Sequence, residues 1–197
     1  CVMAFDGVTI AAMVDELHKF LDGGRFNKIA QPEADELLIT GKGALGQCRL
    51  LLSASASLPL IYFTEKNKVS PLTAPNFCML LRKHIGSARI ADIRQPGLER
   101  VVEFELEHLN ELGDPCKKVL IMELMGKHSN IIFCDDKGMI LDSIKHVSSH
   151  MSSVREVLPG REYFIPQTQD KLDPLTVSED DFINTVCRKP CNISKAL

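Results

Sequence analysis

The sequence lacks the long apolar run of a membrane protein. No stretch approaches the roughly 18 uninterrupted apolar residues that a membrane-spanning helix needs, and the longest apolar candidates are short (Val119–Met125 and Leu50–Leu52). The first residues also lack the basic and then apolar segments of a secretory signal. Residues 1–2 precede Met3, which we interpret as the initiator, so they are interpreted as a cloning remnant. The sequence predicts a cytoplasmic protein with no membrane insertion.

An excess of positive charge is also missing. The chain has 197 residues, of which 23 are basic and 26 acidic, so its formal net charge is −3. A protein that wraps nucleic acid over its whole surface is usually strongly basic, so any nucleic-acid role must depend on a local patch. The 45% hydrophobic and 25% charged content is that of an ordinary globular chain. This composition excludes a disordered tail and a collagen-like repeat.

Familiar catalytic and cofactor-binding motifs are absent as well. The sequence has no GxGxxG, no Walker loop, no HExxH and no GxSxG. Of its seven cysteines only Cys187 and Cys191 are closely spaced, and no second pair completes a zinc site. We interpret the cysteines as reduced thiols, several of them in the core. The sequence predicts no catalytic residue, no metal and no cofactor, and therefore a protein that is not an enzyme.

Hydrophobic periodicity predicts an α+β fold. Apolar residues at helical spacing indicate helices over 10–21, 75–85 and 178–186. Alternating or continuous apolar runs indicate strands over 25–30, 36–40, 47–53, 60–64, 102–106, 119–125, 131–134 and 139–144. Glycines at 41, 43 and 46 are interpreted as turns between strands. We expect mainly antiparallel strands with flanking helices, and a division of the sheet near residue 87.

A few polar residues stand at unusual places in this pattern. Asp6 precedes the first helix, where its carboxylate is expected to cap the helix. Glu99 and Arg100 follow the Pro96–Leu98 turn and are, by default, a surface pair. Glu123 interrupts an apolar run, and a buried carboxylate needs a partner, so we expect a basic group beside it.

Several segments together resemble one protein family. They follow one another in order along residues 3–185, and residues 186–197 are interpreted as the start of a linker to further carboxy-terminal regions. The segments are Ala4–Gly7, Gly23–Arg25, Ile29–Pro32, Leu50–Ala54, Phe77–His84, Gly97–Val101, Glu123–Asn130, Val157–Gly160 and Tyr163. This set is similar to the amino-terminal domain of the NFACT proteins, a family first named for fibronectin-binding protein A.

The resemblance implies a fold and a role. The implied fold is a mainly antiparallel β-sandwich with flanking helices, like the amino-terminal domain of formamidopyrimidine-DNA glycosylase. The implied role is to bind large ribosomal subunits obstructed by peptidyl-tRNA and to recruit tRNA, alanine tRNA in bacteria, for template-free tailing of the stalled chain. The implied tRNA-binding residues are Asp6, Glu99 and Arg100, with Glu99 in place of the family's aspartate. Further residues expected to contact RNA are Arg82, Lys83, Lys127 and His128.

Two other functions follow from the same resemblance. The older family name implies an adhesin at the cell surface that binds fibronectin or fibrinogen, against which the missing secretory signal and the thiols count. The fold alone implies a DNA-repair enzyme. Those enzymes use an amino-terminal proline nucleophile and a zinc finger, whereas this sequence begins its matching part with Met3–Asp6 and has no zinc finger.

Overall fold

Helix α1 (Gly7–Leu21) opens the part of the chain that the structure describes. The computed structural model describes residues 6–166 and 176–188, with residues 185–188 described by their backbone alone. Asp6 precedes α1, and its Oδ1 accepts a hydrogen bond from the backbone N–H of Thr9 at 2.8 Å. Gly23 has φ +64°, the left-handed conformation that commonly follows a helix end. The predicted helix and the capping role of Asp6 are both confirmed.

Four antiparallel strands then form the first half of a sheet. They are β1 (Arg25–Ala30), β2 (Glu36–Gly43), β3 (Gly46–Ser53) and β4 (Leu60–Phe63). Strand β2 is longer than predicted because Gly41 and Gly43 lie inside it and are not turns. A Cβ on Gly41 would lie 2.8 Å from the carbonyl oxygen of Arg25, so glycine here permits close approach of a neighbouring backbone.

The second half of the sheet follows helix α2 (Asn76–Ile85). It contains β5 (Arg89–Arg94), β6 (Val101–Leu109), β7 (Pro115–Glu123), β8 (Asn130–Asp135) and β9 (Ile140–Ser143). Strand β5 is absent from the sequence prediction. Its register shifts between Ile90 and Asp92, and this irregularity breaks the alternation by which strands are recognised.

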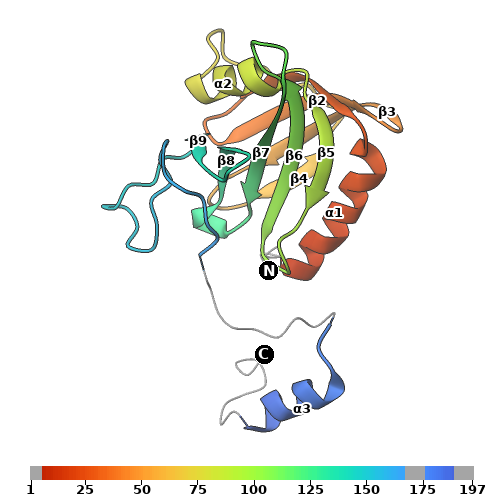
Figure 1. Cartoon of the computed structure of the whole chain (residues 1–197), viewed down its shortest axis with the longest axis vertical. Coiled ribbons are helices and arrows are strands. Elements are labelled where there is room, and N and C mark those ends of the chain that lie inside the picture. Colours follow the sequence, from red (N-terminus) through yellow and green to blue (C-terminus); the bar gives the residue numbers. More distant parts are fainter. Residues whose placement is uncertain (1–5, 167–175, 189–197) are drawn as a thin grey trace. The chain divides into compact units, whose positions relative to one another are not determined.

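All of these strands belong to one sheet in the described part of the chain, in the order β4-β3-β2-β1-β5-β6-β7-β8-β9 (Figure 1). The two halves meet where β1 and β5 share a single register pair, Arg25 with Arg89. Both halves contribute side chains to the same core, in which the rings of Phe26 and Phe104 lie 6.4 Å apart. The α+β, mainly antiparallel prediction is confirmed. The predicted division near residue 87 coincides with this narrow joint, although the halves are hydrogen-bonded to one another.

The chain forms two compact units, and the sheet lies in the first of them. The chain divides into Cys1–Phe164 and Ile165–Leu197. In the second unit, helix α3 (Glu179–Arg188) follows Ser178, whose hydroxyl accepts from the backbone N–H of Asp181 at 3.1 Å. The helix predicted over 178–186 is confirmed, whereas the domain boundary at residue 185 stays a prediction. None of the described helices is long and apolar enough to cross a membrane.

Charged side chains connect β5, β6 and β7 on one face of the sheet. Lys117 Nζ lies 2.8 Å from Glu105 Oε1, and Arg94 lies 3.1 Å from Glu105 Oε2 and 2.8 Å from Glu103 Oε2. These cross-strand pairs stabilise strand neighbours of opposite charge. The hydrogen bond from Lys117, followed by the charge of Lys117 and the contact with Arg94, lowers the pKa of Glu105.

These cross-strand ion pairs predict that the free energy of unfolding depends on pH. Because the pKa of Glu105 is lower in the folded chain than in the unfolded chain, its contribution is present at neutral pH and is lost as the pH falls through the folded value. The unfolding free energies of wild type and Glu105→Gln, measured by chemical denaturation, are expected to differ by about 1 kcal/mol at pH 7. They are expected to converge as the pH falls below the folded pKa of Glu105. Glu162→Gln, at an exposed position, is the control. A difference that stays constant over this pH range would contradict the prediction.

Candidate functional site

The amino-terminal end of α1 carries the first predicted site residue. Asp6 is exposed, and its hydrogen bonds with Thr9, mainly the one from the backbone N–H, lower the pKa of its carboxyl group. The carboxylate is therefore charged at neutral pH. One of its oxygens caps the helix, and the group stays accessible to a ligand.

The side chain of Gln95 attaches this helix end to the turn that precedes β6. Its Nε2 donates to the carbonyl oxygens of Gly7 and Glu99, both at 2.8 Å. Gly7 itself packs closely, since a Cβ there would lie 2.1 Å from the carbonyl oxygen of Leu98. Asp6 is thus held beside Glu99, although 92 positions separate them in the sequence. Sequence reasoning missed Gln95, whose one local signal is an amide side chain directly before a Pro-Gly turn.

Glu99 and Arg100 are half-buried at the end of that turn. The backbone N–H of Glu99 donates to the carbonyl oxygen of Pro96 at 3.1 Å, and Gly97 has φ +54°. The predicted turn is therefore present. Among the described residues neither side chain forms a hydrogen bond or ion pair with another side chain. Within the described ranges the Arg100 guanidinium also donates to no backbone carbonyl oxygen, so no described residue uses its donors.

A loop after β7 lies against the same turn. The backbone N–H of Leu124 donates to the carbonyl oxygen of Arg100 at 2.8 Å. The loop then forms a single 3₁₀ turn, Gly126–His128, in which Lys127 and His128 are exposed. We call the surface formed by Asp6, Glu99, Arg100, Lys127 and His128 the Arg100 surface.

The structure separates the other two predicted residues from this surface. Arg82 and Lys83 lie at the end of α2, at the opposite end of the sheet (Figure 1). Arg82 Nε donates to the carbonyl oxygen of Ile29 at 2.7 Å, and Lys83 Nζ lies 3.1 Å from Glu111 Oε1. The seven predicted residues therefore form two separate groups at opposite ends of the sheet.

Behind the Arg100 surface lies the buried carboxylate of Glu123. Arg155 Nη2 contacts its Oε1 at 2.5 Å and its Oε2 at 2.6 Å, and the hydroxyl of Tyr163 donates to Oε2 at 3.2 Å. Glu123 is fully buried and pairs with Val101 at the start of β6. Burial raises the pKa of Glu123, while the permanent charge of Arg155 acts in the opposite direction. The prediction of a buried Glu123 with a basic partner is confirmed.

Comparison with known proteins agrees with this architecture. The family described as NFACT N-terminal and middle domains matches residues 6–197. The Rqc2 homolog RqcH of Bacillus subtilis (strain 168) is 42% identical over 182 residues, which cover 92% of this chain and 32% of that protein. The ribosome quality control complex subunit NEMF of Mus musculus is 26% identical over 151 residues, or 77% of this chain and 13% of that protein. The chain therefore spans about a third of the bacterial relative.

A solved structure shares the fold. The amino-terminal part of the fibronectin/fibrinogen-binding protein from Streptococcus suis superimposes with a TM-score of 0.87 at 36% sequence identity. The match covers 94% of this chain and 70% of that one. The likeness to the glycosylase domain stays a prediction. Since the family match extends over nearly the whole chain and the fold of a 36% identical protein is the same, the chain belongs to the NFACT family.

Proposed function

We propose that this chain is the RNA-binding amino-terminal domain of a cytoplasmic ribosome quality-control factor. In this role it binds large ribosomal subunits obstructed by peptidyl-tRNA and recruits tRNA, alanine tRNA in bacteria, for template-free tailing of the nascent chain. The names of its bacterial and mouse relatives support a function in quality control of the ribosome. The ribosome supplies the peptidyl-transfer chemistry, so the domain itself acts by binding and is not an enzyme.

The observation that carries this proposal is the Arg100 guanidinium, which binds no other side chain in the part of the chain that the structure describes. It follows the turn that Gln95 joins to the helix end capped by Asp6. Asp6 and Glu99 are acceptors, whereas Arg100 is a planar donor. Such mixed groups suit the edges of unpaired bases, which expose donors and acceptors together. Glu99 keeps the charge of the family's aspartate and places it one methylene further out. Lys127 and His128 add donors at the rim of the same surface.

Removing the guanidinium tests the proposal. Arg100→Ala is expected to weaken tRNA binding about 10- to 100-fold, the effect of losing one bidentate contact, with an unchanged Tm. Anisotropy of labelled tRNA over a salt series measures the affinity. Asp6→Ser retains a capping oxygen and removes the charge, so it separates helix capping from recognition.

A control variant tests whether the loss of any one positive charge weakens tRNA binding. Arg49 lies on β3 in the other half of the sheet, and Arg49→Ala is expected to bind tRNA like wild type. Equal affinities for wild type and Arg100→Ala, with both proteins folded, would overturn the assignment of Arg100.

The name of one structural neighbour favours a second candidate. The Streptococcus suis protein is called a fibronectin/fibrinogen-binding protein, so an adhesin role is the alternative. Immobilised fibronectin or fibrinogen that captures wild type and Arg100→Ala equally, together with a surface-exposed cellular pool, would favour the adhesin. Exclusive sedimentation with large ribosomal subunits would favour the quality-control factor.

A further inference from the structure

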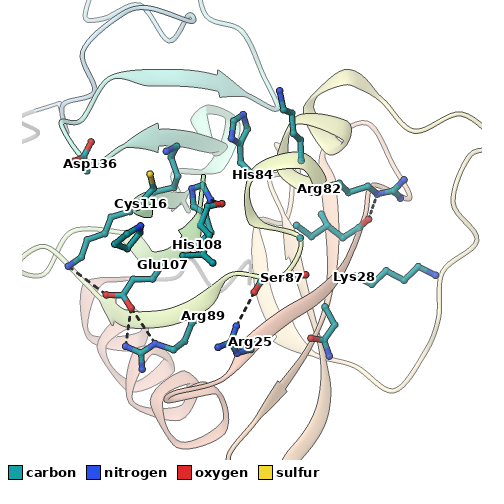
Figure 2. Close-up of a pocket in the computed structure, with 18 residues that line it drawn as sticks. Arg25, Lys28, Arg82, His84, Ser87, Arg89, Glu107, His108, Cys116 and Asp136 are labelled. Carbon is teal, nitrogen blue, oxygen red and sulfur yellow. Dashed lines mark hydrogen bonds and ion pairs between the residues drawn. The ribbon is translucent and has the colours of Figure 1, made fainter. Parts of the chain in front are cut away.

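Figure 2 shows a basic cleft that is lined by residues at the end of α2 and on neighbouring strands. This end of the sheet is opposite the Arg100 surface (Figure 1). The volume of the cleft is about 1180 Å³, and its walls come from β1, the end of α2, β6 and β7. The charged side chains that line it are seven basic ones (Arg25, Lys28, Arg82, Lys83, Arg89, Lys117, Lys118) and two acidic ones (Glu107, Asp136). Seven positive and two negative groups give the cleft a formal charge of +5, although the whole chain carries −3.

Part of this positive charge is already paired. Arg89 Nη2 lies 3.0 Å from Glu107 Oε2, and Lys117 Nζ lies 2.8 Å from a carboxylate oxygen of Glu105 on β6. Lys83 is paired with Glu111, as described above. These pairs are partly exposed and connect neighbouring elements, so they are interpreted as supports of the cleft walls.

Four cations of the cleft have no carboxylate partner in the described part of the chain. Arg82 and Arg25 donate only to backbone carbonyl oxygens, Arg25 Nη1 to Ser87 at 3.5 Å. Such bonds orient a guanidinium without neutralising it. Lys28 and Lys118 stand on β1 and β7, on different walls of the cleft. Because two of these cations are already oriented, an anion that binds them loses less freedom in ordering them.

The cleft also contains two histidines, His84 and His108. Burial, and then the charges of Lys118 and Lys83, lower the pKa of His84. His108 Nδ1 lies 3.0 Å from the carbonyl oxygen of Leu109. Its Nε2 is buried and has no hydrogen-bond partner among the described residues.

The spacing and chemistry of the cleft favour one kind of ligand. The four cations without a carboxylate partner among the described residues come from three elements around a large volume, which suits a row of phosphates better than one small anion. The lining of the cleft contains no phenylalanine, tyrosine or tryptophan that would serve as an apolar anchor for a bound peptide. We propose that this basic cleft binds the phosphodiester backbone of RNA.

The cleft and the Arg100 surface are separate contacts. Arg100 directly precedes β6, and Glu107 lies seven residue steps further along the strand. At ~3.3 Å per residue this is a span of about 23 Å, so one nucleotide cannot touch both. Phosphate contacts position a nucleic acid, whereas base contacts select it. The cleft therefore supplies affinity for RNA of any sequence, and the Arg100 surface supplies selection. This division rests on the proposed function, in which the chain binds RNA.

Neutralising the two unpaired lysines tests the cleft. The whole chain with Lys28→Ala and Lys118→Ala is titrated against a labelled RNA duplex without tRNA features, over a salt series. The slope of log affinity against log salt is expected to fall by roughly 1.5, and the affinity at least about tenfold, because two phosphate contacts are lost. The matched control, Lys66→Ala with Lys137→Ala, removes the same charge from exposed positions that do not line the cleft.

The variants distinguish this inference from the proposed function. Arg100→Ala is expected to keep its affinity for the duplex while it loses affinity for tRNA. The cleft variant could bind the duplex like the matched control while Arg100→Ala still loses affinity for tRNA. In that case the proposal for the cleft is wrong and the proposed function stands. Wild type that binds neither RNA overturns both. Inorganic phosphate that binds calorimetrically to wild type and not to the cleft variant, with equal duplex binding by the two proteins, shows that a free anion is the occupant.

Discussion

Replacing Arg155 with alanine is expected to lower the free energy of unfolding by about 3–5 kcal/mol, because the variant leaves a buried carboxylate without its partner. Glu123 is fully buried, and Arg155, whose side chain is 10% exposed, contacts both of its oxygens. Arg155 also donates to the carbonyl oxygen of Phe164 at 2.7 Å and lies over the ring of Tyr163, 5.6 Å from its centroid. Its loss therefore releases the residues around position 164 from the sheet as well.

The pH dependence identifies the cause of this destabilisation. Without Arg155, burial holds the pKa of Glu123 above its unfolded value, so folding takes up a proton. The variant's deficit is then largest at neutral pH and shrinks as the pH falls toward the unfolded value of about 4.3. Adding Glu123→Gln to the variant is expected to recover about 1–2 kcal/mol, since the buried group no longer carries charge.

Chemical denaturation followed by circular dichroism measures these differences. Arg161→Ala removes another arginine, which is exposed and pairs with Glu156 at 2.8 Å, so this control is expected to change stability by less than ~1 kcal/mol. A loss below ~1 kcal/mol in Arg155→Ala would show that the pair contributes no more than a surface ion pair.

Replacing Gly7 with alanine is expected to destabilise the protein by about 1–3 kcal/mol and to weaken tRNA binding. Helix propensity alone predicts the opposite sign, a gain of up to ~1 kcal/mol. The added methyl group would lie 2.1 Å from the carbonyl oxygen of Leu98 and 2.9 Å from its carbonyl carbon. Both are backbone atoms, so they cannot move aside unless the whole turn moves. Helix α1 must therefore move away from the turn that Gln95 attaches to it.

The neighbouring position provides the control. Val8 is 48% exposed, and Val8→Ala follows helix propensity alone, with little change or a slight gain in stability. Thermal unfolding and tRNA anisotropy are measured on both variants. A Gly7→Ala protein that is as stable as wild type would show that α1 and the Leu98 turn are not in close contact.

Local patterns were sufficient for most of the elements. Alternation and helical spacing predicted the helices and nearly all strands, and the position of Asp6 before an apolar helix predicted its cap. Glu123 was predicted to be buried because a charge inside an apolar run has few alternatives. In each case the structure depends on residues that are close in the sequence or on the general tendency of apolar side chains to leave water.

Long-range partners could not be predicted in the same way. Nothing in the local sequence of Arg155 indicates that it reaches Glu123, and the bonds of Gln95 join positions that only the fold brings together. The separation of Arg82 from Arg100 depends on the direction of the strands between them. Strand β5 was missed because an irregular register removes the periodic signal.

The close approaches at both ends of α1 limit how this protein can vary in length. Gly7 packs against Leu98 at one end, and at the other a Cβ on Gly43 would lie 1.9 Å from the carbonyl oxygen of Phe20. One inserted or deleted residue in α1 would turn everything beyond it by about 100° and shift it by ~1.5 Å. The change would break one of the two contacts whichever end stayed in place. Insertions and deletions are therefore expected to be tolerated in the segment between β4 and α2, and not in α1.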